Sequence, residues 1–519
     1  MTRRLVCIAA LAVSGCAAPS TSSAPTPARA ATLAPTADEL RRDLFAFADD
    51  SMLGREAGTP NAFRGAKMIA VRLAALGVEP AGDSGYFQRV PMTVSAVASA
   101  SNVTVVNGAG RANIAVGVDV APLTSLGPGA PPPHLVADAD LVFASYGITD
   151  SKLGRNDYAG LDLRGKAVVV VVSAPPGVKD SVQKHGFEGG PGIQSRLIRL
   201  IQAGPAAIVL VLGGGSAELY DQAAGQFMRS LTLIDTTPMI PEDQRVLPLV
   251  LLARDKPGSP LVPAGWATNA KARFAAGTRL SARIVATKSQ TMEYNVVGVV
   301  RGSDPALNGT YVAFGGHLDH IGIQPGAGTD TIANGADDDG SGSMAVLSIA
   351  CAVVQGPRPK RSALFVWHTA EEKGLLGSAW FTDHPTVPID SIVAQLNADM
   401  IGRNGADSLY LVGPAAAPKQ QSKVLGALAD SVNASMARPF TIDRSFDSPD
   451  HPERIYFRSD HFNYARKGIP ILFFTTGLHA DYHKASDSPD KIDYVKMARV
   501  AEFIWRTGMA AANAPSRPR

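Results

Sequence analysis

Apolar runs suited to buried strands alternate with amphipathic helices from about residue 290 to the end of this 519-residue chain. This alternation limits the fold more than any other feature, because it is typical of a doubly wound α/β sheet, here of mixed strand direction. Sites in such folds lie beyond the carboxyl ends of the strands. The predicted strands are 311–316, 363–368, 392–397, 409–412 and 471–475. The predicted helices lie near 339–355, 374–383, 418–437 and 491–512.

The chain before residue 290 has two parts. A helical pattern begins at Ala37, and a second helix is predicted at 66–76, after the segment Arg55-Glu56-Ala57-Gly58-Thr59. The part from 130 to 285 is β-rich, and Pro and Gly cluster at both of its borders, as they do in linkers. We therefore predict an α/β domain made of residues 37–129 and 286–519, with a β-rich domain, 130–285, inserted between them.

The first 16 residues, MTRRLVCIAALAVSGC, combine two arginines, a short apolar run and small residues before Cys16. This order is typical of a bacterial export signal, and the run is too short to span a bilayer as a mature helix. Val13-Ser14-Gly15-Cys16 resembles the lipobox of lipoproteins, in which the cysteine is acylated. A disordered tether is predicted for residues 17–36, because they are rich in Pro, Ala, Ser and Thr.

These terminal features predict where the protein resides. Ala17 is not acidic, so we expect an outer-membrane lipoprotein that faces the periplasm and touches the membrane only through Cys16. A periplasmic or secreted protein without the lipid is the alternative.

The charge balance and the cysteine content argue against nucleic-acid binding, a disulfide framework and a thiolate metal site. Lys and Arg number 49 against 46 Asp and Glu, and no basic run beyond Arg3-Arg4 suggests a phosphate-binding face, so nucleic acid is not an expected partner. Three cysteines without a CxxC pair provide neither a disulfide framework nor a thiolate zinc site. Any metal must therefore be held by imidazole and carboxylate groups.

Most of the histidines lie between His317 and His483, in the stretch that also holds the acidic clusters. His317 directly follows a predicted strand, and Asp319 is close enough in sequence to orient its imidazole, as carboxylates do for ligating histidines. Further acidic or histidine residues border later elements: Asp337-Asp338-Asp339, Glu371-Glu372, Asp399 and His483. Alone, the Asp run is equally consistent with a solvated helix start. Together, these oxygen and nitrogen donors suit two divalent ions, and zinc in a hydrolytic site.

Six motifs in this region occur in an order that is familiar from one family: GGHLD (315–319), GADDDGSG (335–342), AEEKGLLGS (370–378), NADMIGR (397–403), RSDH (458–461) and YHKASD (482–487). They resemble the co-catalytic zinc metallopeptidases of the aminopeptidase and glutamate carboxypeptidase type. The stretch GLDLRGKAVVVV (160–171) resembles the protease-associated domain that is often inserted in these enzymes. The resemblance implies a zinc exopeptidase fold, two zinc ions per chain and peptide substrates.

The resemblance also implies a role for each matching ligand. Asp338 would bridge the two ions. One ion would further be held by Glu372 and His483, and the other by His317 and Asp399. Relatives have a cis peptide bond after the bridging acid, so an unusual bond is expected after Asp338.

Two catalytic roles follow from the same resemblance. Glu371 would be the general base, which accepts a proton from the attacking water and returns it to the leaving amine. Since two consecutive glutamates cannot both face the metals from an extended strand, the chain must turn at Ala370 to Glu372. Tyr456 matches a phenol that donates to the oxyanion, and a buried core tyrosine is the alternative interpretation. His320 and His461 are interpreted as supporting residues rather than ligands.

The predicted activity is the removal of single residues from peptide N-termini by an exported enzyme. A carboxypeptidase of the same family is one alternative, and it would need a cationic pocket, for which Arg403, Arg454 and Arg458 are candidates. A catalytically inactive binding protein is the alternative from another class. Side-chain preference and oligomeric state are not predicted.

Overall fold

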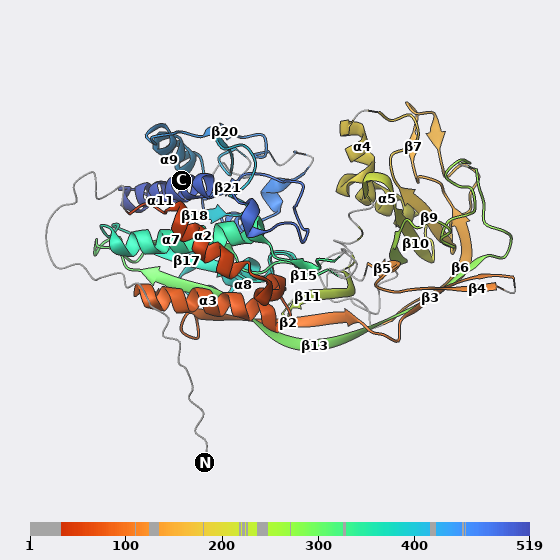
Figure 1. Ribbon diagram of the computed structural model, residues 1–519, viewed down its shortest axis with the longest axis horizontal. Helices are drawn as coiled ribbons and strands as arrows, with labels where there is room; N and C mark the ends of the chain where they lie inside the picture. Colours follow the sequence, from red (N-terminus) through yellow and green to blue (C-terminus); the bar gives the residue numbers. More distant parts are fainter. Residues whose placement is uncertain are drawn as a thin grey trace, which may run out of the picture.

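The computed structural model describes residues 33–518, apart from positions 109, 124–133, 180, 217–219, 221–223, 225–226, 236–247, 270, 325–328, 416–421, 449–450 and 452. The predicted export signal, its Cys16 and most of the predicted tether lie outside the described residues. Figure 1 shows two lobes, joined along the lower edge of the view by the strands β2 (Phe87–Val97) and β13 (Arg279–Val300). None of the helices in the described ranges is both long and apolar enough to cross a membrane.

The first lobe is built on a mixed sheet. Besides β2 and β13, its strands are β11 (Arg229–Leu233), β14 (Tyr311–His317), β17 (Ser362–His368), β18 (Ile392–Ala398), β19 (Ser408–Val412), β20 (Thr441–Asp443) and β21 (Ile471–Thr475). Their order is β11-β2-β13-β17-β14-β18-β21-β19-β20. The central strands β17, β14, β18 and β21 are parallel, and β13 and β19 flank them in antiparallel direction. The predicted doubly wound, mixed α/β sheet is confirmed.

Both faces of this sheet are covered by helices. Along β14, Val312 and Phe314 pack with α2, α3, α7, α9 and α11 on one face, whereas Tyr311 and Ala313 pack with α8 and α10 on the other. Because successive side chains alternate and both faces are buried, the strand is apolar throughout. The helices are α2 (Ala37–Phe47), α3 (Pro60–Leu76), α7 (Gly342–Gln355), α8 (Leu376–Asp383), α9 (Lys423–Ala434), α10 (His461–Arg466) and α11 (Tyr494–Asn513).

Local sequence explains the bounds of the early helices. Thr59 caps α3 by accepting a hydrogen bond from the N–H of Asn61, and Pro60 occupies the first turn, where no N–H is needed. Gly77 ends the helix with a left-handed backbone at φ 75°. These capping signals place α3 directly after the segment Arg55 to Gly58, which contacts the site described below.

The second lobe is a separate β-rich unit around its own apolar clusters. Its strands are β3 (Asn102–Asn107), β4 (Gly110–Ile114), β5 (Val120–Pro122), β6 (His134–Phe143), β9 (Ala167–Val172), β10 (Ala207–Leu212) and β12 (Leu249–Arg254). The first part of β13 pairs with β3 and β6, and β6, β9, β10 and β12 run parallel. Helices α4 (Ser181–Glu188) and α5 (Gly190–Gln202) belong to the same lobe.

Three features of this arrangement were not predicted. Strands β3, β4 and β5 lie in the second lobe, although the predicted inserted domain begins only at residue 130. Strand β13 passes through both lobes, and sequence analysis missed it because its central residues 287–290 are polar and exposed. Strand β11 lies within the range predicted for the inserted domain, yet it pairs with β2 on the sheet of the first lobe.

Candidate active site

The predicted site residues gather where the parallel strands end. His317 is the last residue of β14, and it lies beside His368 at the end of β17. Asp399 directly follows β18, and His483 lies on the loop after β21. The carboxyl ends of parallel strands meet at one edge of a sheet, which brings these distant segments together.

Asp338 lies between two histidines. Its Oδ1 is 3.2 Å from Nε2 of His317, and its Oδ2 is 3.1 Å from Nε2 of His483. The Oδ1 of Asp399 is 3.7 Å from Nε2 of His317, and Oε2 of Glu372 is 3.0 Å from Nε2 of His483. The predicted ligands therefore form two groups that share the carboxylate of Asp338, with one oxygen directed to each group.

His320 joins the second group, which sequence reasoning did not foresee. Its ring is fully buried, and its Nδ1 lies 2.7 Å from Oε1 of Glu372 and 3.9 Å from Oδ2 of Asp338. His320, Asp338 and Glu372 place their donor atoms within 4.8 Å of one another, as do His317, Asp338 and Asp399. The only sequence signal was the spacing of His317 and His320 within one loop.

The donor atoms of both groups fit divalent cations. Buried polar atoms in proteins nearly always have hydrogen-bond partners. Among the described residues, however, several buried donor atoms of the two groups have none: His317 Nε2, Asp338 Oδ2, Glu372 Oε1 and His483 Nε2. Imidazole nitrogen and carboxylate oxygen form a ligand set that suits zinc. The residues present therefore match one cation in each group.

The three adjacent aspartates, Asp337 to Asp339, make different contacts. Asp337 accepts a hydrogen bond from the N–H of Gly402 at 2.7 Å, and Asp339 accepts one from the N–H of His317 at 2.9 Å. Both carboxylates thus anchor neighbouring backbone segments, and only Asp338 points between the histidines. The peptide bond between Asp338 and Asp339 is cis, which confirms the unusual bond expected there.

Glu371 lies on a sharp turn after β17. Ala370 has a left-handed backbone at φ 53°, and the N–H of Gly374 donates to the carbonyl of Glu371 at 2.8 Å, which confirms the predicted turn. Asp319 accepts a hydrogen bond from the N–H of Glu371 at 3.0 Å. Nδ1 of His317 lies 3.1 Å from the backbone carbonyl of Asp319 and 3.8 Å from its carboxylate, so the hydrogen-bonding partner of the imidazole is the backbone of Asp319 and not the carboxylate that was expected to orient it.

The charges in the site perturb one another strongly. Burial raises the pKa of Glu371 well above its usual range, and the nearby carboxylates of Glu372 and Asp399 raise it further. Burial acts in the same direction on Asp338, but the neighbouring imidazoles of His317 and His483 outweigh it and hold the pKa of Asp338 well below its usual range. Glu371 therefore has the higher affinity for a proton.

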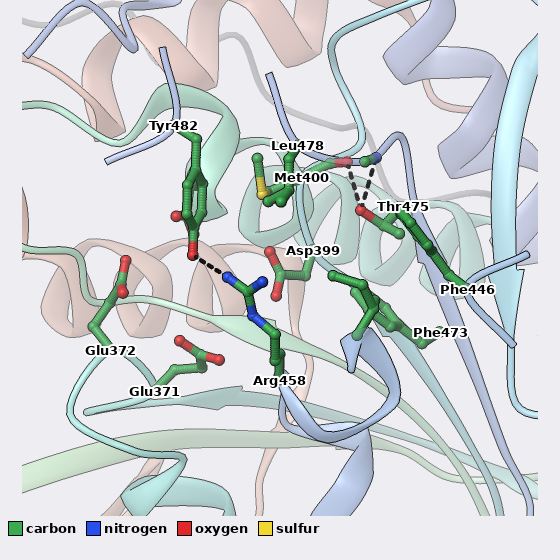
Figure 2. Close-up of a pocket in the computed structure, with 13 residues that line it drawn as sticks. Glu371, Glu372, Asp399, Met400, Phe446, Arg458, Phe473, Thr475, Leu478 and Tyr482 are labelled. Atoms are coloured by element: carbon green, nitrogen blue, oxygen red, sulfur yellow. Dashed lines mark hydrogen bonds between the residues drawn. The ribbon is translucent and has the colours of Figure 1, made fainter. Parts of the chain in front are cut away.

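A pocket opens beside these carboxylates (Figure 2). Glu371, Glu372 and Asp399 line one part of it, together with Tyr482 and Arg458. The Nη2 of Arg458 donates to the hydroxyl of Tyr482 at 3.2 Å. The remaining lining is mainly apolar: Met400, Phe446, Ile455, Phe473, Thr475, Gly477 and Leu478.

Tyr456 does not line this pocket. Its side chain is only 1 % exposed and packs with Phe457, His461 and Phe462, and its hydroxyl has no hydrogen-bond partner in the described part of the chain. The phenol that reaches the pocket belongs to Tyr482, the residue before His483, which sequence analysis did not single out.

Of the three arginines considered for a cationic pocket, only Arg458 lines the cavity. The Nη2 of Arg403 pairs with Asp481 at 2.6 Å, and Arg454 lies over the ring of Phe457. His461 is buried, with its Nε2 2.9 Å from the carbonyl of Tyr456, so it supports the loop, as expected.

Residues 295–508 match the model of the family described as Peptidase family M28. A probable leucine aminopeptidase of Trichophyton verrucosum (strain HKI 0517) is 26% identical over 250 residues, which cover 45% of this chain and 62% of that protein. The chain thus spans about three-fifths of the length of this relative.

Two solved structures share the fold over nearly the whole chain. An aminopeptidase from Aneurinibacillus sp. strain AM-1 has a TM-score of 0.58 at 17% identity, covering 95% of this chain and 97% of its own. A zinc aminopeptidase from Bacillus subtilis has a TM-score of 0.57 at 16% identity, covering 92% and 95%. At these identities the likeness concerns the fold.

Proposed function

From the match of residues 295–508 to the model of Peptidase family M28, we propose that this chain is a zinc-dependent aminopeptidase that hydrolyses N-terminal residues from peptides. One observation carries the proposal. The two oxygens of Asp338 approach two different histidines, His317 at 3.2 Å and His483 at 3.1 Å, and each histidine is grouped with a further carboxylate. This is the arrangement that a pair of bridged cations requires.

The ligand assignment completes this proposal. His317, Asp338 and Asp399 would hold one zinc ion, and Asp338, Glu372 and His483 would hold the second. The proximity of the imidazole of His320 to Glu372 supports an orienting role for His320 at the second ion. Bound zinc would polarise the substrate carbonyl and lower the pKa of water towards neutrality.

Glu371 is the residue placed to move protons. Its carboxylate lines the pocket and lies 3.9 Å from Nε2 of His317, and burial raises its pKa well above the usual range. It would accept the proton of the attacking water and deliver it to the leaving amine. Asp319 holds the backbone of Glu371 in this position through the 3.0 Å hydrogen bond.

Tyr482 is the phenol available to the developing oxyanion. Burial raises its pKa well above the usual range, so the hydroxyl keeps its proton at neutral pH. Its oxygen accepts a hydrogen bond from Arg458, and this contact holds the phenol at the wall of the pocket. A preorganised donor of this kind stabilises a transition state more than a ground state.

The apolar part of the pocket suggests the preferred substrate. Phe446, Phe473 and Met400 line the side opposite Glu372, and they would contact an apolar N-terminal side chain (Figure 2). We therefore propose that peptides with a bulky apolar first residue are hydrolysed fastest.

Carboxypeptidase activity is the second candidate, because Arg458 provides a positive charge inside the pocket. Its guanidinium is already bonded to Tyr482 and, at 3.2 Å, to Glu453, which favours a supporting role. The test compares leucyl-peptides with free and blocked N-termini, after the purified protein has been analysed for zinc. Release of leucine from the free peptide only, by a protein with two zinc ions, is expected. Release of the C-terminal residue from both peptides would refute the aminopeptidase.

The protease-associated character of residues 130–285 is a further proposal. The separate apolar clusters of the second lobe support it. Calorimetry of the whole chain should then show two unfolding transitions, of which zinc raises only one. A single transition that zinc raises as a whole would count against this division.

Export and lipid attachment at Cys16 are likewise proposed, from the terminal sequence. In a bacterial host, the full chain should incorporate labelled palmitate and fractionate with membranes, whereas Cys16→Ala should do neither. Equal distribution of both proteins in the soluble periplasmic fraction would contradict the anchor.

A further inference from the structure

Arg55 lies in a segment that the proposed reaction does not use. Its side chain is completely buried, and its guanidinium donates hydrogen bonds to four backbone carbonyls. The acceptors are Phe47 at 3.0 Å, Leu318 at 2.9 Å, Asn334 at 2.8 Å and Gly335 at 2.9 Å.

Two of these acceptors belong to loops that carry proposed ligands. Leu318 directly follows His317, and Gly335 lies three residues before Asp338. One planar guanidinium therefore joins the two loops whose separation sets the distance between His317 and Asp338. The N–H of His320 also donates to the carbonyl of Arg55, at 3.4 Å. The fork of an arginine holds several acceptors in a defined geometry, which a flexible ammonium group cannot do.

The next residue reaches a third loop. Oε1 of Glu56 is 3.0 Å from Nζ of Lys373, whose side chain is only 3% exposed and which directly follows Glu372. Two residues further on, the N–H of Gly58 donates to Glu293 at 2.9 Å, and Glu293 in turn contacts the hydroxyl of Thr369 at 3.4 Å. The segment from Arg55 to Gly58 is thus tied to the turn that carries Glu371 and Glu372.

Charge reinforces these contacts. Burial lowers the pKa of Arg55 to about 10, and the carboxylates of Asp319 and Asp339 limit this shift, so the guanidinium is protonated at neutral pH. A permanent buried cation beside these two aspartates offsets part of the repulsion between their carboxylates.

We infer that Arg55, supported by Glu56, is a positioning residue that sets the spacing of the ligand-bearing loops and thereby the zinc affinity of the site. This inference rests on the proposed function. Removing a supporting partner of metal ligands typically weakens metal binding by about 10-fold to 100-fold. We expect a loss of this size for Arg55→Met.

The chain offers a matched control in the second lobe. Arg196 is 2% exposed and also donates to four carbonyls, those of Tyr146, Ser173, Phe187 and Gly192. Arg196→Met should therefore destabilise the protein to a comparable degree without touching the site. Zinc affinity is measured by titration calorimetry on metal-free protein, at a temperature where circular dichroism shows each variant to be folded.

The expected result is weaker zinc binding in Arg55→Met and unchanged binding in Arg196→Met. Equal affinity in Arg55→Met and the wild type, or equal losses in both variants, would overturn the inference. Two milder changes keep it testable if Arg55→Met does not fold. Arg55→Lys, which keeps the charge but not the fork, and Glu56→Gln should both weaken zinc binding, and wild-type affinity in both would refute the positioning role.

The same titration separates this inference from the proposed function. A wild-type chain that binds no zinc would refute the proposed function and this inference with it. A wild-type chain that binds zinc as tightly as Arg55→Met would refute the inference alone.

Discussion

Exchanging one tyrosine at a time decides which phenol serves the reaction. Tyr482 lines the pocket and Tyr456 is the residue that the resemblance implies, and removal of one hydroxyl by Tyr→Phe leaves each aromatic ring in place. The hydroxyl of Tyr482 lies in the pocket and is oriented by Arg458 at 3.2 Å. The hydroxyl of Tyr456 is buried outside the pocket without a hydrogen-bond partner among the described residues.

The two substitutions are expected to have different effects on kcat and on stability. Loss of a single oxyanion donor lowers kcat by about 100-fold to 1,000-fold, so we expect this for Tyr482→Phe. A buried polar group without a partner costs about 1–3 kcal/mol, so Tyr456→Phe should raise the free energy of unfolding, by up to this amount, and leave kcat near the wild-type value.

Steady-state hydrolysis of a leucyl substrate gives kcat, and urea unfolding gives the stability of each variant. Zinc content is checked in both, because Tyr482 precedes His483. A Tyr482→Phe variant with full zinc content and wild-type kcat would refute the assignment. A large loss of kcat in Tyr456→Phe would reinstate the role that the resemblance implies for Tyr456.

Three further predictions concern the acidic groups and the metal. Glu371→Gln should lower kcat by at least about 100-fold, because the general base is lost. The zinc content, measured by elemental analysis, should not change, because no metal ligand is removed. An active variant would exclude Glu371 as the base. Glu293 is buried and its pKa is raised to about 7 from an ordinary 4.5, so its contribution to stability is fully present below pH 4.5 and is lost as the pH rises through about 7. Glu293→Gln should remove about 3 kcal/mol of this pH dependence in unfolding experiments between pH 4 and 8, and an unaltered slope would contradict the burial effect. Removal of zinc by a chelator should lower Tm and abolish hydrolysis, and re-added zinc should restore both. The reason is that an ion which binds only the folded chain stabilises it by mass action. A Tm independent of zinc would argue against a resident metal.

Local patterns in the sequence were sufficient for the elements that carry the site. The apolar run 471–475 coincides with β21, and the run 363–368 lies within β17. The position of a ligand directly after a strand was also readable, as for His317 and Asp399. These features depend on neighbours in the chain, because burial on both faces of a sheet demands an uninterrupted apolar run.

Other predictions needed the chain to be folded. Strand β13 was missed because its polar centre is stabilised by backbone pairing with β2, which no local pattern reveals. A supporting role was expected for His320, but only the folded chain shows that the carboxylate it contacts, at 2.7 Å, is that of Glu372.

The sequence alone thus determined the fold class, the set of imidazole and carboxylate donors and their placement at strand ends. Only the tertiary structure decided which oxygen of Asp338 meets which histidine, which tyrosine reaches the pocket, and that Arg55 holds Leu318, a residue 263 positions away. The physical reason is the distance along the sequence over which each kind of interaction acts. Strand and helix patterns arise from interactions between near neighbours, whereas these contacts exist only after the sheet and its helices have packed.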